Sequence, residues 1–330
     1  MTESGALSAE VVIALRGLVV GFGQQLVLKG VDLDVRRGEV LGLVGPSGGG
    51  KSVLTRTILG LTPKRAGTIQ IFGQDVDALT RTERNRQERR WGVLFQQGAL
   101  FSGLNVLQNV EAPMREHLPL DPATRTEIAL MKLDLVGLAR SAASKLPSEL
   151  SGGMVKRAAL ARALALDPEI VFLDEPTAGM DAFGRRVLWD EVERLKAEGK
   201  TLVLTTHYIE EAERLCDEIC IVQAGKVVAR DTPAALIERY GGDARIDFVA
   251  RGFSLTPELD RLGTWTRTDE RYALCAQGAP GLALGTIVAR ANALGVTIDE
   301  LDLHRPGLED AFIAITGETL DDEGARGVAA

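Results

Sequence analysis

The stretch Gly45–Ser52, GPSGGGKS, decides how the fold of this sequence is interpreted. It fits the pattern G-x-x-x-x-G-K-[S/T] at every position, and it lies between the apolar run VLGLV and a segment of helical periodicity. Glycines let backbone N–H groups turn inward around phosphate oxygens, and the start of the following helix adds a positive partial charge. The stretch therefore predicts a strand, a phosphate loop (residues 45–52) and a helix.

The side chains of this loop indicate a nucleotide and a magnesium ion as ligands. Lys51 is expected to reach the β- and γ-phosphates, and the Ser52 hydroxyl to ligate Mg²⁺. The residues expected to contact the nucleotide here are Gly45, Pro46, Ser47, Gly48, Gly49, Gly50, Lys51 and Ser52. The alternative, a glycine-rich turn with a surface lysine, does not call for a strand and a helix on either side.

A second motif, IVFLDE at residues 170–175, places two acids after a buried strand. Asp174 is expected at the carboxyl end of that strand, facing Mg²⁺ through its water shell. Glu175 is placed to polarise the attacking water. Paired acids at a strand end can also be simply solvated, but the apolar run before them and the phosphate loop upstream favour a catalytic pair.

Composition narrows the class of protein. Hydrophobic residues make up 45% of the 330 residues and charged residues 25%, an ordinary globular balance, and the net charge of −8 argues against a general nucleic-acid binder. The three cysteines are too few for a disulfide framework or a four-ligand zinc site, which is typical of a reducing cytosol. The N-terminus does not read as a signal peptide, and no apolar run is long enough to span a membrane, so a membrane role requires a partner.

The order of expected elements predicts two domains. Strands and helices alternate over residues 11–239 as in a mostly parallel α/β domain, with a helical subdomain at about 98–165. Residues 240–320 follow the order β-α-β-β-α-β of a small α+β, ferredoxin-like module. Residues 1–10 and 321–330 have the composition of disordered ends.

Six motifs in one order make the region from about residue 12 to 235 resemble the ATP-binding subunit of an ABC transporter. Besides the two motifs above, ELSGGM at 149–154 matches the signature and FQ at 95–96 the Q-loop. AGMD at 178–181 matches the D-loop, and TTH at 205–207 the switch histidine. The resemblance implies an α/β P-loop ATPase fold, ATP hydrolysis coupled to transport, and a head-to-tail homodimer holding two ATPs at its interface.

In such a dimer, each ATP is held by the phosphate loop of one subunit and the signature of the other. This arrangement accounts for Gly152 and Gly153, because a helix start approaches a phosphate closely only where no Cβ intervenes. The Ser151 hydroxyl either touches the phosphate or only caps the helix.

The resemblance implies four further site residues. His207 would bond the γ-phosphate and hold Glu175 and its water, and Gln96, preferred over the adjacent Gln97, would sense Mg²⁺ and water. Asp181 would communicate between the two sites. Phe22 takes the place of the aromatic that stacks on adenine, with a core residue as the alternative.

Two features of the sequence favour different transporters. Met154, where most importers and exporters have Gln, and the helical subdomain resemble the Mla/Mce lipid-transport ATPases. The segment THYIEEAERLCDEICIVQAGKVVARDTPAAL and the ending RPGLEDAFIAITG instead resemble drug and polysaccharide exporters of the daunorubicin-resistance type. We expect lipid transport first, because contacts with the permease lie in the helical subdomain, and export as the alternative.

The expected partners are integral membrane permease subunits and, for the lipid reading, an Mce-type lipid-binding protein, with no nucleic acid. The expected location is the cytoplasmic face of the cell membrane, as a peripheral subunit. A non-transport ABC ATPase is a remote alternative, since the sequence has one cassette and neither heptads nor zinc spacing. A metabolic P-loop kinase would have no use for the signature or His207.

Overall fold

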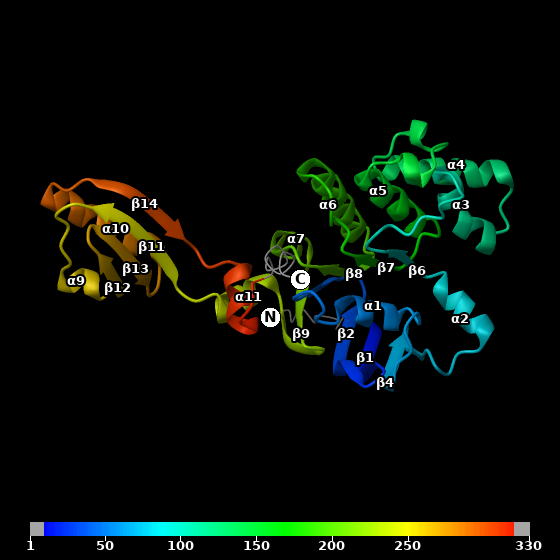
Figure 1. The fold of residues 1–330 in the computed structure, drawn as a ribbon, viewed down its shortest axis with the longest axis horizontal. Helices are drawn as coiled ribbons and strands as arrows, with labels where there is room; N and C mark the ends of the chain where they lie inside the picture. Colours follow the sequence, from blue (N-terminus) through cyan, green and yellow to red (C-terminus); the bar gives the residue numbers. More distant parts are fainter. Residues whose placement is uncertain (1–9, 320–330) are drawn as a thin grey trace, which may run out of the picture. The chain divides into compact units, whose positions relative to one another are not determined.

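The computed structural model describes residues 10–319, so the ends predicted to be disordered lie outside the described residues, except for Glu10. The chain divides into two compact units, with the boundary between Pro233 and Ala234. The predicted boundary at 239/240 lies further along the chain, so most of helix α8 (Pro233–Tyr240) falls in the second unit. Figure 1 shows the elements of both units.

The first unit is built on a six-stranded sheet whose order is β10-β9-β3-β8-β7-β6. All neighbouring strands are parallel except the β9–β10 pair. The strands are β3 (Val40–Val44), β6 (Trp91–Leu94), β7 (Ile170–Asp174), β8 (Thr201–Thr206), β9 (Glu218–Gln223) and β10 (Lys226–Asp231). Every residue of β3, β7 and β8 is buried, as expected for central strands of a parallel sheet.

The parallel strands bring three functional segments to one edge of this sheet. The phosphate loop follows β3, the acid pair ends β7, and His207 follows β8. Because β8 pairs with both β3 and β7, the carboxyl ends of the three strands are neighbours. Helices follow each of them: α1 (Lys51–Ile58), α6 (Ala182–Ala197) and α7 (Ile209–Leu215).

A second, antiparallel sheet has the order β2-β1-β4-β5, and α2 (Arg81–Glu88) follows it. Its strands are β1 (Val11–Phe22), β2 (Gln25–Arg36), β4 (Ala66–Ile71) and β5 (Gln74–Asp75). Side chains of both sheets share one buried cluster, in which Leu15 and Ile69 pack with Leu43, Leu54 and Phe172. The apolar alternation predicted for the first strands therefore faces this common core.

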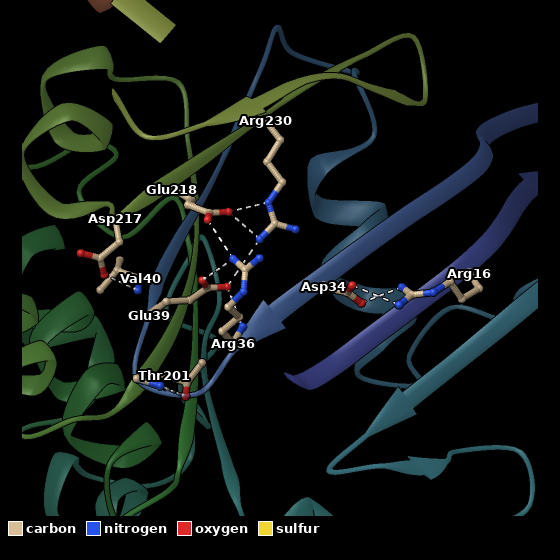
Figure 2. A network of polar contacts seen from close by, with 10 residues as sticks. Arg16, Asp34, Arg36, Glu39, Val40, Thr201, Asp217, Glu218 and Arg230 are labelled. Atoms are coloured by element: carbon tan, nitrogen blue, oxygen red, sulfur yellow. Dashed lines mark hydrogen bonds and ion pairs between the residues drawn. The ribbon is translucent and has the colours of Figure 1, made fainter. Parts of the chain in front are cut away.

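A polar network cross-links the two sheets at one edge (Figure 2). Arg36 of β2 donates to Glu218 of β9 over 2.8 Å, and Arg230 of β10 donates to the same carboxylate over 2.6 Å. Glu39 accepts the Arg36 backbone N–H at 2.6 Å. Burial raises the pKa of Glu39, and the neighbouring charge of Glu218 acts in the same direction. The arginines therefore hold together two carboxylates that would otherwise repel each other.

The helical segment lies between β6 and β7 in the sequence, and a side chain caps the start of each of its three α-helices. Asn105 begins α3 with a capping box, Asp121 caps α4, and Ser151 caps α5. The elements are α3 (Val106–His117), α4 (Pro122–Leu135), the 3₁₀ turns η1 (Arg140–Ala142) and η2 (Pro147–Glu149), and α5 (Gly152–Ala163). We call α5 the signature helix, because it begins at the two signature glycines.

The second unit has the predicted order of elements. Its sheet order is β12-β13-β11-β14, with every neighbouring pair antiparallel, as in a ferredoxin-like sheet. After α8 the elements are β11 (Ala244–Ala250), α9 (Pro257–Asp260), β12 (Gly263–Thr268), β13 (Arg271–Ala276), α10 (Pro280–Leu294), β14 (Ile298–His304) and α11 (Leu308–Thr316). Its core combines Phe248, Phe253 and Tyr272 with apolar residues of α10 such as Ile287.

One surface carboxylate of the first unit gives a pH-dependent prediction. Arg90 donates two hydrogen bonds to Glu169, at 2.6 and 3.0 Å, and Arg37 adds one at 2.9 Å. These bonds, chiefly those from Arg90, lower the pKa of Glu169 from 4.5 to about 2. A lowered pKa in the folded state stabilises the fold above pH 4.5, and this contribution is lost as the pH falls towards 2.

We therefore expect Glu169→Gln to remove part of the loss of stability between pH 5 and pH 2. The effect should be only about 0.5–1 kcal/mol, because the side chain is 40% exposed. Urea unfolding of both proteins at neutral and acidic pH measures it. An unchanged acid dependence in Glu169→Gln would show that this cluster does not stabilise the fold.

Candidate functional site

The phosphate loop is built so tightly that it requires its glycines. A Cβ on Gly45 would lie 2.1 Å from the carbonyl oxygen of Val222, and Gly48 and Gly50 have φ of 75° and 107°. Gly50 is the N-cap residue of α1, so the loop leads directly into a helix start. The predicted strand, loop and helix are thus all present, with the backbone free of side chains where it turns.

The side chain of Lys51 is hydrogen-bonded to the backbone of this loop. It is buried, at 5% exposure, and its Nζ donates to the carbonyl oxygens of Gly45 at 2.6 Å and Pro46 at 3.0 Å. Both of these acceptors are neutral carbonyls of the loop, so these two hydrogen bonds do not cancel the charge of the ammonium group. The loop therefore presents a positive charge and a helix N-terminus in the same place.

Ser52 and Asp174 meet although they are far apart in the sequence. The Ser52 hydroxyl donates to Asp174 Oδ1 at 3.0 Å, and the Thr205 hydroxyl donates to the same oxygen at 2.5 Å. Asp174 is 2% exposed. Sequence reasoning assigned no role to Thr205, even though it begins the quoted TTH motif. This residue orients the carboxylate from the neighbouring strand β8.

Glu175 is surrounded by the other predicted polar residues. Gln96 Nε2 donates to its Oε2 at 2.7 Å, and His207 Nδ1 lies 3.7 Å from its Oε1. The backbone of Glu175 has φ of 46°, a left-handed conformation that is uncommon without glycine. Its N–H donates to Thr205, at 3.0 Å to the carbonyl and 3.1 Å to the hydroxyl oxygen.

Lys156 also reaches Glu175, and sequence reasoning missed it. This lysine of the signature helix is 5% exposed, and its Nζ donates to the backbone carbonyl of Glu175 at 2.6 Å. Burial lowers its pKa, while the carboxylates of Glu175, Asp174 and Glu211 act in the opposite direction. In the sequence, only the presence of a lysine on an otherwise alanine-rich face of the helix indicated that this residue has a buried contact.

Glu211 is a second buried residue that sequence reasoning missed. It is wholly buried on α7, and its Oε1 accepts from the Thr177 hydroxyl at 2.8 Å and from Trp189 Nε1 at 3.0 Å. Burial raises the pKa of Glu211, although hydrogen bonds from Thr206, Thr177 and Trp189 act against the shift. The residue ties the helix after His207 to the segment that leads to Asp181.

The signature residues begin their helix with a bare, outward-facing backbone. Ser151 Oγ accepts the Met154 N–H at 3.4 Å, so the cap predicted as one reading of Ser151 is formed. A Cβ on Gly152 would meet nothing within 4 Å, and one on Gly153 only the methyl of Met180 at 3.5 Å. The packing of this chain alone therefore does not require either glycine.

Two other predicted residues lie at element ends. Asp181 is the N-cap of α6, and its Oδ1 accepts the Gly184 N–H at 2.6 Å. Phe22, the last residue of β1, is 56% exposed, so it is not a core residue. In the structure, Ser52 contacts Asp174, and both Gln96 and His207 lie beside Glu175. The hydrogen bonds of Ser151 and Asp181, in contrast, stay within their own helix starts.

The donor set suits magnesium better than a transition metal. Within residues 10–319, no group of three or more His, Cys, Asp or Glu side chains is placed to hold a metal ion. The hydroxyl of Ser52, the carboxylate of Asp174 and the amide of Gln96 are hard oxygen ligands of the kind that Mg²⁺ binds together with phosphates and water. These three residues therefore fit the ion that the sequence predicted.

Comparisons with known proteins agree with this geometry. The family model described as ABC transporter matches residues 28–178. The Nod factor export ATP-binding protein I of Burkholderia lata is 36% identical over 314 residues, which cover 94% of this chain and 98% of that protein. The chain belongs to the ABC transporter family. It is an ATP-hydrolysing subunit of such a transporter, and the predicted family and enzyme class are confirmed.

Further relatives of this ABC subunit differ in how much of it they match. The daunorubicin resistance ATP-binding protein DrrA3 of Streptomyces coeruleorubidus is 36% identical and covers 94% of this chain and 97% of its own length. The intermembrane phospholipid transport system ATP-binding protein MlaF of Haemophilus influenzae is 39% identical, covering 74% of this chain and 92% of its own.

A solved structure confirms the predicted fold of the ABC cassette. The dimeric post-hydrolysis state of the ATP-binding cassette MJ0796, bound to ADP and Pi, superposes with a TM-score of 0.63 at 30% identity. The match covers 67% of this chain and 98% of the MJ0796 chain. Within the described residues of this ABC subunit, no helix is both long and apolar enough to cross a membrane.

Proposed function

We propose that this ABC subunit powers export, as a relative of the Nod factor and daunorubicin-resistance ATPases. The observation that carries the proposal is the extent of the match. The exporter relatives align with 94% of the chain, which must include much of the second unit, whereas MlaF aligns with 74%. The order of preference predicted from the sequence, lipid transport before export, is therefore reversed.

The membrane partner tests this proposal. We expect the full chain, purified from detergent-solubilised membranes of its own host, to bring with it a permease of the exporter kind. Mass spectrometry of the purified complex identifies the subunits. A permease that arrives with a lipid-binding Mce-type protein would support the lipid reading instead.

We also propose that the working form is a head-to-tail homodimer at the cytoplasmic face of the membrane. The bare helix start at Gly152 and Gly153 has no function in the packing of one chain, which favours an approach by a ligand bound to a second chain. Phe22 is exposed, as a residue that stacks on adenine must be. Asp181, at the start of α6, would lie between the two sites.

The proposed chemistry follows from the hydrogen bonds within the site. The phosphate loop and Lys51 bind the β- and γ-phosphates. Ser52, Asp174 and Gln96 would hold Mg²⁺, which would neutralise phosphate charge. Glu175 accepts a proton from the water that attacks the γ-phosphorus as the bond to the ADP oxygen breaks. His207 binds the γ-phosphate and keeps Glu175 oriented.

The permease is expected to contact the helical segment beside Gln96. Phe101 is 56% exposed and borders a hollow of about 330 Å³ that Phe95 and Pro113 also line. Its backbone is fixed, because Asn109 accepts the Phe101 N–H at 2.8 Å and donates to its carbonyl at 3.1 Å. An exposed aromatic on a fixed backbone, in a hollow that is also lined by Phe95, the residue before Gln96, favours docking of an apolar segment of the permease.

Replacing Phe101 with Asp should therefore separate ATP hydrolysis from permease binding. We expect the isolated variant to hydrolyse ATP at the original rate, and its co-purification with the permease to fall by about tenfold or more. Leu61→Asp, at a residue that is 60% exposed elsewhere on the first unit, is the matched control. Equal permease recovery with both variants would exclude this hollow as the docking site.

A further inference from the structure

The backbone of Glu175 depends on a hydrogen bond from another part of the chain. Glu175 has a left-handed φ of 46°, and such a conformation at a residue other than glycine persists only where its surroundings hold it. Thr205 accepts the N–H of Glu175, and the carbonyl of Glu175 accepts from the Ala178 N–H at 3.2 Å and from Lys156 Nζ at 2.6 Å. Lys156 therefore supplies the shorter of these two hydrogen bonds, and it does so from a different helix, whereas Ala178 lies three residues further along the same turn.

Lys156 belongs to the signature helix, so its hydrogen bond also connects that helix to the backbone of Glu175. Lys156 lies one turn beyond the bare glycine start of α5. If the start of α5 meets the ATP of a partner chain, any displacement of the helix moves the Nζ of Lys156. The carbonyl of Glu175, and with it the carboxylate that faces its own ATP, then moves as well.

We propose that Lys156 is a positioning residue that links the signature helix to the catalytic glutamate of the same chain, and so couples the two ATP sites of a dimer. This inference rests on the proposed function, in which Glu175 is the base and the signature meets the partner's ATP. Lys156 touches neither ATP nor water in this account, because its hydrogen bond goes to the backbone of Glu175.

The first test uses steady-state kinetics of the full-length chain. Lys156→Met keeps the length of the side chain but removes the donor, and we expect kcat to fall by about 10- to 100-fold with an unchanged KM for ATP. Lys156→Arg keeps a donor and should recover part of kcat. Unchanged kcat in Lys156→Met, or no recovery in Lys156→Arg, would overturn the inference.

A second buried lysine provides the matched control. Lys132 of α4 is also 5% exposed, and it pairs with Asp167, away from Glu175. Lys132→Met should lower the melting temperature without changing kcat. If Lys156→Met lowers the melting temperature equally and leaves kcat intact, Lys156 has only a structural role.

Mixed dimers distinguish an action on the same chain from an action on the partner. When Lys156→Met and Glu175→Gln are combined in one subunit, the partner keeps an intact base, and turnover should equal that with Glu175→Gln alone. When the two changes are in different subunits, both bases are impaired and turnover should fall by a further 10-fold or more. The opposite pattern would show that Lys156 acts through the partner's ATP and contradict the inference.

Glu175→Gln on its own separates failure of this inference from failure of the proposed function. Normal turnover in Glu175→Gln removes Glu175 as the base, and the proposed chemistry fails with it. Loss of turnover in Glu175→Gln together with normal turnover in Lys156→Met overturns only the role of Lys156.

Discussion

Glu175→Gln is expected to lower ATP turnover by about 10²- to 10⁴-fold while ATP still binds. The amide keeps the size of the side chain, and Thr205 and Lys156 still hold the backbone. An amide does not accept a proton from water at neutral pH, so only the chemical step is lost. Phosphate release measures turnover, and a fluorescent ATP analogue measures binding.

The control for this variant is Glu198→Gln, which changes an exposed acid at the end of α6. We expect it to hydrolyse ATP at the original rate. Near-normal turnover in Glu175→Gln would remove Glu175 from the role of base, whatever the other contacts of the site.

Lys51→Ala is expected to weaken the binding of ATP itself. The ammonium group is the buried positive charge of the phosphate loop, and hydrogen bonds to charged groups contribute about 1.5–3 kcal/mol each. The loss corresponds to an increase in the Kd for ATP of roughly 10- to 150-fold. Isothermal titration with Mg–ATP measures it directly.

Two controls keep this result interpretable. Circular dichroism shows whether the variant folds, since its loop carbonyls lose the donor that holds them. Lys64→Ala removes a lysine that is paired with Asp77 and lies outside the phosphate loop, and it should bind ATP normally. An unchanged Kd in a folded Lys51→Ala protein would count against the assignment of the phosphate loop.

The parts of the site that are local in the sequence could be predicted from it. The phosphate loop depends on glycines that lie within one short stretch of the sequence, and the structure shows why one of them is needed, since a Cβ on Gly45 would collide with Val222. The capping role of Ser151 also follows from its neighbours along the chain. The order of strands and helices after residue 240 was similarly sufficient to predict the topology of the sheet in the second unit.

The contacts of Lys156 and Glu211 could not be predicted in the same way. Lys156 reaches the carbonyl of Glu175 from another helix, and Glu211 reaches Thr177 and Trp189 from α7. Each contact depends on how helices pack on the sheet, and neither residue type has a required spacing to its partner. A buried charge becomes recognisable only when its surroundings are known.

The class of transported substrate could not be predicted from the signature sequence, for a different reason. Met154 lies just after the signature glycines and contributes its backbone N–H to the cap, a contact that any residue other than proline makes. Its side chain therefore gives little information on what is transported. The extent of the match separates the relatives better, since the Nod factor exporter aligns with 94% of the chain and MlaF with 74%.

The molar mass of Glu175→Gln in solution tests the central claim, a dimer in which the signature of one chain completes the ATP site of the other. Light scattering should give the mass of one chain without nucleotide and of two chains with Mg–ATP. Adding Gly153→Asp should abolish the dimer without unfolding the chain, because a Cβ there meets only Met180 at 3.5 Å. A single-chain mass with Mg–ATP, or a dimer that Gly153→Asp leaves unchanged, would contradict the account.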